Sequence, residues 1–346
     1  MPIIHTTSIV TRAGGKVKPV YRACRAAEVN FQQRSTFAIR IAAILSSVHS
    51  ALKDLENSLK AVLFGQEQVI RQLLATAVAG GHALLEGLPG LGKTLLARAF
   101  AESSGLSYRR IQFTPDLLPA DVTGTEILED GQFVFRRGPI FAQVVLADEI
   151  NRATPKTQSA LLEAMQERGV TVGGTRYALP EPFMVLATQN PLELEGTYPL
   201  PEAQLDRFMS KITVQAPPRA TWIRILSEEP AVAQTVEGLD LLKARAESQQ
   251  VVVSQPALEA IANTAQLASE EKHLRMALSP RGAKAWLGLA KALAYISGRA
   301  HLDWDDLRGS AMPALSHRLL LTEEAQFEGI RIEQIVQDLL RRTMAK

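Results

Sequence analysis

The residues best suited to chemistry lie in one glycine-rich stretch. Residues 87–94 read Gly-Leu-Pro-Gly-Leu-Gly-Lys-Thr, which satisfies the pattern G-x-x-x-x-G-K-[ST] in full. Glycines let such a loop wrap closely around phosphate oxygens, with its backbone N–H groups pointing at them. Lys93 is expected to contact the β- and γ-phosphates of ATP, and the Thr94 hydroxyl is expected to ligate Mg²⁺. The candidate ATP-binding residues of this loop are Gly87, Leu88, Pro89, Gly90, Leu91, Gly92, Lys93 and Thr94.

The sequence on either side of this loop has the form that the motif requires. A short apolar strand is predicted over residues 82–86 and a helix over residues 94–103. The loop therefore leads into a helix N-terminus, where unpaired N–H groups and the helix dipole favour an anion. A chance glycine-rich turn is the alternative, and the complete motif in this context argues against it.

An acidic pair supplies a second part of a nucleotide site. Apolar residues 144–147 predict a strand that ends at Asp148 and Glu149. Asp148 would hold Mg²⁺ next to Thr94, and Glu149 would orient and deprotonate the attacking water. Alone, an Asp-Glu pair is a weak signal, because the solvated end of any strand can look the same. After a phosphate-binding loop, the pair predicts hydrolysis of the triphosphate.

An amide follows another predicted strand. Residues 183–188 have the pattern of a buried strand, and Asn190 comes two residues later. The Asn190 amide could hydrogen-bond the attacking water or the γ-phosphate. Asn190 also precedes Pro191, and Asn-Pro begins many loops. The local sequence leaves both interpretations open.

The elements that must position these residues alternate between strands and helices. Such alternation predicts an α/β fold, with a parallel sheet covered by helices on both faces. Two pairs of short strands flank Asp130-Gly131 and Gly173-Gly174, which indicates two β-hairpins inserted into this body. The predicted strands are residues 82–86, 108–113, 144–147, 183–188 and 212–214, and the predicted helices are residues 51–63, 67–79, 94–103, 155–166 and 202–208.

The composition of the chain changes after Ala216-Pro217-Pro218. The remainder has almost entirely helical patterning, over residues 258–269, 281–297, 304–311 and 332–342. We therefore expect three parts. They are a basic, disordered extension over residues 1–50, an αβα nucleotide-binding core over residues 51–216, and a helical lid domain over residues 217–346.

Composition and charge narrow the class of protein. The chain is 46% apolar and 21% charged, as in soluble globular proteins, and no apolar run approaches the ~20 residues of a membrane span. Residues 1–50 carry a net charge of +6, so residues 51–346 carry a net charge of −4. This mildly acidic charge does not favour binding to nucleic acid. The single cysteine, Cys24, fits a reducing compartment, so we expect a cytoplasmic protein. Residues 1–50 could instead be a targeting segment or be translated upstream of the true start. Arg40 interrupts the apolar stretch that a secretory signal would need.

Several stretches resemble the MoxR family of AAA+ ATPases. The resemblance runs from about residue 55 to the end of the chain and is densest over residues 80–208. It implies an AAA+ core with a helical lid, and a homo-oligomeric ring, most simply a hexamer. The stretches that carry it are residues 80–94, 112–119, 121–125, 138–142, 146–153, 187–191, 195–208 and 279–281.

The resemblance also implies roles for three polar residues. Asn190 matches the sensor 1 position. Arg207 matches the arginine finger, which reaches across a subunit interface to the γ-phosphate bound by the neighbour. Arg281 matches sensor 2, on the lid and directed at the bound nucleotide, so that lid and core would close on ATP. Without the family, a surface ion pair of Arg207 with Asp206 or Glu202 is favoured.

The two predicted hairpins match inserts of the clade that includes MoxR proteins, magnesium chelatase subunits and the minichromosome maintenance helicases. In such rings the hairpins face the pore or the substrate. Phe133 and Phe135 could therefore contact a client, although ordinary packing is at least as probable for one of the pair. Gly65-Gln66 match the loop that borders the adenine, a contact that backbone atoms usually make.

The motifs predict a Mg²⁺-dependent ATPase. The resemblance to MoxR proteins implies that it remodels, matures or assembles a protein client, with a von Willebrand factor A domain protein as a candidate partner. One alternative is a nucleic-acid motor, for which only Arg136, Arg137 and Arg176 of the hairpins offer charge. Another is a metal-chelatase-type motor of the same clade. A third is a nucleotide-dependent assembly switch, and the presence of both Glu149 and Arg207 argues against it.

Overall fold

The computed structural model describes residues 48–191 and 196–344. Residues 1–47 of the expected N-terminal extension therefore lie outside the described residues. The first described helix covers residues 48–62, and its apolar side chains Leu52, Leu55 and Leu59 are fully buried at helical spacing. None of the described helices is long and apolar enough to cross a membrane.

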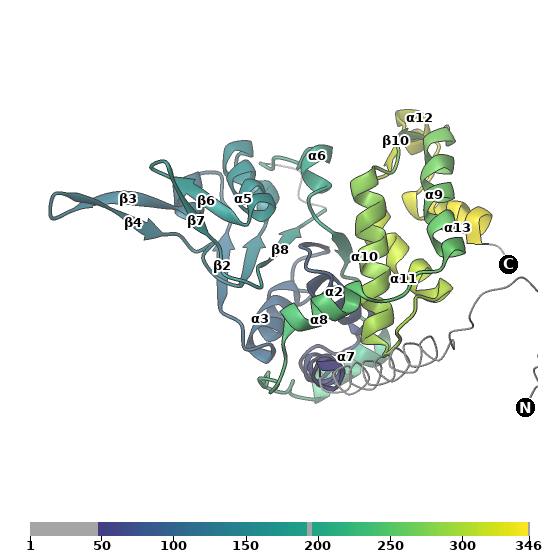
Figure 1. Ribbon diagram of the computed structural model, residues 1–346, viewed down its shortest axis with the longest axis horizontal. Helices are drawn as coiled ribbons and strands as arrows, with labels where there is room; N and C mark the ends of the chain where they lie inside the picture. Colours follow the sequence, from purple (N-terminus) through teal and green to yellow (C-terminus); the bar gives the residue numbers. More distant parts are fainter. Residues whose placement is uncertain (1–47, 192–195, 345–346) are drawn as a thin grey trace, which may run out of the picture. The chain divides into compact units, whose positions relative to one another are not determined.

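Five parallel strands form the central sheet, in the order β2-β5-β8-β1-β9. Two of them, β2 and β8, are labelled in Figure 1. β5 and β8 are buried almost throughout, as expected for central strands with both faces covered. The predicted α/β class is thus confirmed. The strands are β1 (Ala83–Glu86), β2 (Tyr108–Gln112), β5 (Val144–Asp148), β8 (Met184–Gln189) and β9 (Ser210–Thr213).

Each face of the sheet packs against its own set of helices. Val144 and Leu146 of β5 belong to a cluster that includes α2 (Glu67–Val78), α3 (Lys93–Ser103) and the C-terminal helices. Val145 and Ala147 point the other way, into a cluster with α5 (Pro155–Glu167). The two-residue period of a strand explains this division.

Both predicted hairpins are present. β3 (Gly124–Glu129) pairs with β4 (Gln132–Arg137), and β6 (Gly169–Val172) pairs with β7 (Thr175–Ala178). All four turn residues have positive φ angles, as two-residue hairpin loops require. The hairpins contact each other, because the Phe135 ring stacks on Tyr177 with the ring centroids 4.1 Å apart. A short helix that the sequence did not indicate, α4 (Pro119–Thr123), precedes the first hairpin.

The C-terminal region is helical, as expected, with one exception. β10 (Leu274–Met276) and β11 (Leu320–Leu321) form a small antiparallel pair, which three-residue and two-residue strands cannot reveal by periodicity. α10 packs against α2 of the core, and α11 packs against β9. The helices are α7 (Arg219–Ser227), α8 (Leu241–Gln249), α9 (Gln255–Glu270), α10 (Pro280–Ile296), α11 (Trp304–Leu315), α12 (Glu323–Phe327) and α13 (Ile332–Met344).

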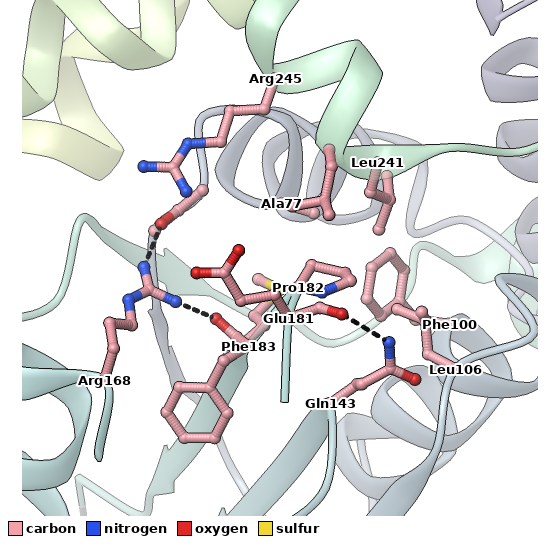
Figure 2. Close-up of a pocket in the computed structure, with 14 residues that line it drawn as sticks. Ala77, Phe100, Leu106, Gln143, Arg168, Glu181, Pro182, Phe183, Leu241 and Arg245 are labelled. Atoms are coloured by element: carbon pink, nitrogen blue, oxygen red, sulfur yellow. Dashed lines mark hydrogen bonds between the residues drawn. The ribbon is translucent and has the colours of Figure 1, made fainter. Parts of the chain in front are cut away.

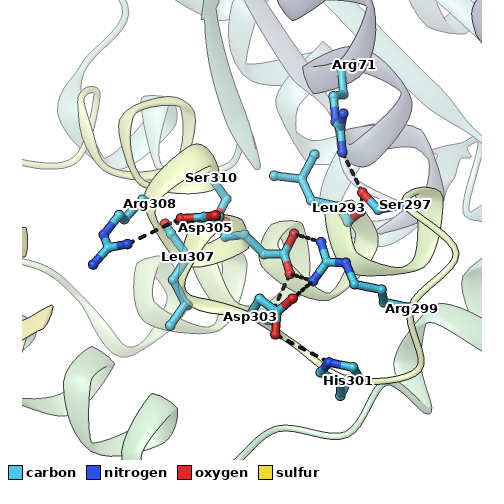
Figure 3. Close-up of polar contacts among 11 residues, drawn as sticks. Arg71, Leu293, Ser297, Arg299, His301, Asp303, Asp305, Leu307, Arg308 and Ser310 are labelled. Carbon is cyan, nitrogen blue, oxygen red and sulfur yellow. Dashed lines mark hydrogen bonds and ion pairs between the residues drawn. The ribbon is translucent and has the colours of Figure 1, made fainter. Parts of the chain in front are cut away.

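A partly buried ion-pair network lies at the loop between α10 and α11 (Figure 3). Arg299 donates to Asp303 at 2.7 Å and to both carboxylate oxygens of Asp306 at 2.6 Å. Asp306 is only 4% exposed, and it also accepts from the backbone N–H of Asp303 at the start of α11. The network therefore holds the helical domain together internally.

Arg168 ties together segments at the edge of the sheet where β1 begins. Its guanidinium donates to the carbonyl oxygens of Phe183 at 2.6 Å and of Gly80 at 2.8 Å (Figure 2). Gln143 donates to the carbonyl of Glu181 at 3.0 Å beside it. The cavity between these residues measures about 20 Å³, room for no more than a water-sized molecule.

Candidate nucleotide-binding site

The phosphate-binding loop, the acidic pair and Asn190 meet at one edge of the sheet. The loop follows β1, Asp148 ends β5, and Asn190 follows β8. Because β5, β8 and β1 are adjacent and parallel, their carboxyl ends lie side by side. They enclose a cavity of about 360 Å³, lined by Pro89, Gly90, Gly92, Lys93, Thr94, Leu95, Asp148, Glu149, Thr188, Gln189 and Asn190.

Lys93 lies folded over the loop that carries it. Its ammonium donates to the carbonyl oxygens of Gly87, of Leu88 at 3.3 Å and of Gln189 at 3.3 Å. Partial burial lowers the pKa of Lys93, and the carboxylates of Asp148 and Glu149 oppose this shift. The ammonium is thus held at the mouth of the loop, where phosphate oxygens would replace the carbonyls as its partners.

Asp148 is held by neighbours on three sides and is 7% exposed. Its Oδ1 accepts from the hydroxyl of Thr188 at 2.6 Å, and its Oδ2 accepts from Arg110 at 2.7 Å. The Thr94 hydroxyl lies 3.5 Å from the same Oδ2. A hydroxyl and a carboxylate at this spacing are oxygen ligands that Mg²⁺ prefers, so Thr94 and Asp148 fit a magnesium ion.

The orientation of the Glu149 side chain is set by its backbone conformation and by its hydrogen-bond partners. Its φ angle is +57°, a left-handed conformation that costs a non-glycine residue roughly 1–2 kcal/mol. Its N–H donates to the Thr188 hydroxyl at 2.8 Å, so one threonine fixes both acidic residues. Its Oε2 accepts from Gln112 at 2.8 Å and from Arg152 at 3.2 Å. The carboxylate is therefore fixed in direction before any substrate arrives.

A second, apolar cavity of about 230 Å³ adjoins the first, and Gly90, Gly92 and Leu95 line both. Leu63, Leu91 and Trp222 of α7 are among its other lining residues. An aromatic and aliphatic cavity beside a phosphate-binding loop suits a planar base. Gln66, which was expected to border the adenine, also lines this cavity and is 9% exposed. Its side-chain amide donates to the carbonyl oxygen of Gln215 at 3.1 Å.

The structure does not bring Arg207 and Arg281 to these cavities. Arg207 precedes β9, and β9 is parallel to β1, so Arg207 lies at the edge of the sheet opposite the phosphate-binding loop. Arg281 lies in the first turn of α10, and its charge helps to lower the pKa of His82, which precedes β1 at that same opposite edge. The expectation that Arg281 faces the nucleotide of its own chain does not match this location.

The ion pair that the local sequence predicts for Arg207, with Asp206 or Glu202, does not form. Its two candidate partners bind other arginines. Asp206 accepts from Arg318 at 2.6 Å, and Glu202 accepts from Arg275 at 2.8 Å. Within residues 48–191 and 196–344, no hydrogen bond or ion pair of the Arg207 side chain is found.

Sequence reasoning missed several residues that shape the site. Thr188 and Gln112 each lie at or near the end of a strand that neighbours β5, which is the one signal that could have found them. Trp222 and Ile225 have helical spacing just after the Pro-Pro hinge, and both line the apolar cavity. No local pattern indicates Arg110 as the partner of Asp148.

The strand order, the phosphate-binding loop after the first strand of the sheet, the acidic pair and the helical C-terminal domain together define a P-loop ATPase of the AAA+ class. Residues 82–210 match the family model described as ATPase family associated with various cellular activities (AAA). Residues 258–339 match an AAA lid domain.

Similar proteins narrow the class further. The chain is 43% identical over 301 residues to YeaC of Bacillus subtilis, covering 85% of this chain and 94% of YeaC. It is 38% identical over 297 residues to Chaperone MoxR1 of Mycobacterium tuberculosis, covering 82% of this chain and 79% of that protein. The crystal structure of a presumed ATPase from Cytophaga hutchinsonii superposes with a TM-score of 0.80 at 38% identity, covering 89% of this chain and 98% of that one. The chain belongs to the MoxR family of AAA+ ATPases.

Proposed function

We propose that this protein hydrolyses ATP to ADP and phosphate, with Mg²⁺, inside a homo-oligomeric ring of six subunits. The ring uses this energy to remodel, mature or assemble a protein client, and the single cysteine fits work in the cytoplasm. The observation that carries the proposal is the location of Arg207 at one edge of the sheet and of the phosphate-binding loop at the other.

This separation gives each subunit two unlike faces. One face holds the ATP cavities, and the other presents Arg207, with Arg281 on the same side. Head-to-tail packing would place the arginine of one subunit in the cavity of the next, and such heterologous contacts close into rings. A guanidinium suits this position because it is always charged and can pair bidentately with phosphate oxygens.

Within the completed site each side chain has a separate task. Glu149 accepts a proton from the attacking water, and Asn190 orients that water. Lys93 binds the β- and γ-phosphates, and Arg207 of the neighbour stabilises charge on the γ-phosphate. Thr94 and Asp148 would hold Mg²⁺, which would neutralise phosphate charge.

The first hairpin supports a protein client over a nucleic acid. Phe133 and Leu128, which face each other across the hairpin, are 76% and 65% exposed. Its two arginines already have partners, since Arg136 pairs with Glu129 and the Arg137 guanidinium lies 5.3 Å from the centre of the Phe141 ring. In the second hairpin, Arg176 donates to the carbonyl of Glu167. An exposed apolar tip suits an apolar segment of a polypeptide, such as one offered by a von Willebrand factor A domain partner.

ATPase rate against protein concentration tests the ring. The rate per subunit is expected to rise with concentration, because the site is complete only at a subunit interface. Arg207→Ala and Glu149→Gln are each expected to be inactive, and their 1:1 mixture to recover activity at roughly a quarter of the interfaces if subunits assemble at random. A rate that is independent of concentration and of Arg207 would exclude the proposal.

A further inference from the structure

Arg318, just after α11, is a buried arginine at the joint between the two domains. Its side chain is 3% exposed, and it donates to the Asp206 carboxylate at 2.6 Å. It also donates to the carbonyl oxygens of Asp206 at 3.2 Å, Phe208 at 2.6 Å and Met209 at 3.1 Å. All three carbonyls belong to the segment that contains Arg207.

His317 strengthens the same contact. Its Nε2 lies 3.0 Å from the carbonyl oxygen of Phe208, which therefore has two partners from the end of α11. Burial lowers the pKa of His317 well below its ordinary value, so the ring is neutral and Nε2 is the donor. The backbone on both sides of Arg207 is thus fixed by lid side chains, while the Arg207 side chain itself remains partly exposed.

The first turn of α10 packs directly against Arg318. A Cβ atom added at Gly282 would lie 2.7 Å from the Cδ of Arg318, closer than real Cβ contacts allow. Gly282 follows Arg281, and the charge of Arg281 is among the influences that lower the pKa of Arg318. Burial is the largest of these influences, and the Asp206 carboxylate opposes it. Arg281, Gly282, Arg318 and the segment of Arg207 therefore form one continuous row of contacts.

The geometry of a guanidinium makes this contact rigid. Its planar fork has fixed donor directions, so a side chain with this many acceptors has one position relative to them. Moving α11 relative to the core would have to move residues 206–209 with it or leave a buried charge unpaired, which is strongly unfavourable. Trp222 of the same lid domain lines the apolar cavity beside the phosphate-binding loop, which we call the base cavity. The lid therefore also contacts the nucleotide site of its own subunit.

We propose that Arg318, with His317, is a positioning residue for Arg207, so that the lid of one subunit sets where its arginine enters the nucleotide site of the next. The proposal rests on the function proposed above, in which Arg207 acts across a subunit interface. Arg318 lines neither cavity of its own subunit and acts only through Arg207. An error of about 1 Å in such a group can cost roughly a hundredfold in rate.

Arg318→Gln is the primary test, with Glu149→Gln as the mixing partner. Alone, Arg318→Gln is expected to hydrolyse ATP at least about tenfold more slowly than wild type, while it binds a fluorescent ATP analogue within about threefold of wild type. Its own ATP site is intact, so mixing it with Glu149→Gln subunits is expected to restore activity as for Arg207→Ala. A variant that had merely lost its structure would bind ATP poorly and would not be restored by mixing.

Two milder variants keep the test decisive if Arg318→Gln does not fold. Asp206→Asn retains the shape of the carboxylate but removes its charge. Gly282→Ala favours the helix yet crowds Arg318. Both are expected to lose a few-fold in ATPase rate and to recover in the mixture. Full activity of both variants would overturn the proposal.

Two arginines of the lid serve as matched controls. Arg275→Gln breaks an exposed ion pair between lid and core beside Arg207, without contact to the backbone of residues 206–209. Arg299→Gln breaks the partly buried ion-pair network within the lid (Figure 3). Arg275→Gln is expected to leave the ATPase rate within about twofold of wild type. Arg299→Gln is expected to lower the melting temperature and to gain nothing specific from mixing.

The outcomes separate the two proposals. If Arg207→Ala is not restored by Glu149→Gln subunits, the trans arginine of the proposed function is wrong. If Arg207→Ala is restored but an Arg318→Gln variant that still binds ATP is fully active, or is inactive and not restored, the positioning role of Arg318 alone is wrong.

Discussion

The side-chain amide of Gln112, at the end of β2, donates a hydrogen bond of 2.8 Å to Oε2 of Glu149, which follows β5. Arg152 donates to the same oxygen at 3.2 Å. Gln112 also accepts from Arg110, and Arg110 binds Asp148. The carboxylate proposed as the general base is therefore part of a network that reaches the proposed magnesium ligand.

Replacing Glu149 by Gln should separate binding from hydrolysis. A glutamine has the same shape and can still accept from Gln112, but it cannot take a proton from water. The turnover number is therefore expected to fall by about 10²–10⁴, with ATP affinity nearly unchanged. Single-turnover hydrolysis of radiolabelled ATP measures the loss of hydrolysis. Equilibrium binding of ATP measures the affinity. Normal hydrolysis by this variant would contradict the mechanism.

Gln112→Ala is the companion variant. It removes one of the two donors to Glu149 and leaves the carboxylate in place. A change in turnover smaller than about tenfold is expected, because Arg152 and the backbone conformation still direct Glu149. A loss as large as that of Glu149→Gln would show that Gln112 has a chemical task of its own.

Lys93→Ala is expected to abolish ATP binding. The ammonium is the one side-chain cation that lines the phosphate cavity among the described residues, and it would bind phosphate directly. ATP at about 100 times its dissociation constant should stabilise wild type by about 2.7 kcal/mol and this variant hardly at all, as measured by thermal unfolding. Lys291→Ala, which removes a lysine of the lid, is the control and should keep the full shift.

Trp222 should report on the base cavity. It is 47% exposed and lines that cavity, whereas Trp286 is fully buried elsewhere in the lid. ATP binding is expected to change the fluorescence of wild type and not of Trp222→Phe. Trp222→Ala should weaken ATP binding by roughly 1–3 kcal/mol, the usual contribution of base stacking, and Trp222→Phe by much less. Equal affinities of the two variants would place the base elsewhere.

The two phenylalanines of the first hairpin should behave differently. Phe135 stacks on Tyr177 and contacts Phe141 edge-on at 5.7 Å between ring centroids, whereas Phe133 is 76% exposed. Phe135→Ser is expected to lower the free energy of unfolding by more than about 1 kcal/mol, because it loses two aromatic contacts. Phe133→Ser should change it by less than about 0.5 kcal/mol. Urea titration of both variants measures the change in the free energy of unfolding. Equal changes would refute the prediction that Phe135 stabilises the fold and Phe133 does not.

Acid should destabilise the fold through His82. Burial, then the charge of Arg168, lowers its pKa to about 3, and Arg281 and Arg245 act in the same direction against a hydrogen bond to Met165. Figure 2 shows Arg168 and Arg245 in the part of the fold around Phe183, whose ring contacts that of His82. The unfolded chain binds a proton below about pH 6.5, and the folded chain does not until about pH 3. Stability is therefore expected to fall by about 1.4 kcal/mol for each pH unit below 6.5.

His82→Asn isolates this contribution. An asparagine oxygen can replace Nδ1 as the acceptor for the N–H of Val185, and it does not titrate. The free energy of unfolding of wild type and variant is measured in urea from pH 7 to pH 4.5. Below pH 6.5, wild type should lose about 1.4 kcal/mol per pH unit relative to the variant. A difference that is independent of pH would show that His82 is protonated normally in the folded state.

Periodicity and motif spacing predicted the α/β class, the positions of the five strands and both hairpin turns. They could do so because buried strands read as short apolar runs and because Asp130-Gly131 and Gly173-Gly174 suit positive φ angles. The β10–β11 pair was missed because strands of two and three residues are too short to show an alternation, and α4 was missed because a five-residue helix makes little more than one turn. The predicted helix over residues 202–208 ends earlier, at Leu205.

The sequence by itself determined which residues form the phosphate-binding loop and which carboxylates follow β5, because a loop of contiguous residues and the end of a strand are local features. Tertiary structure alone decided which distant side chains reach them. It placed Thr188 between Asp148 and Glu149, moved Arg281 away from the cavities of its own chain, and set Arg318 against the segment of Arg207. The physical reason is that these contacts depend on strand order and on lid packing, which join residues up to 112 positions apart.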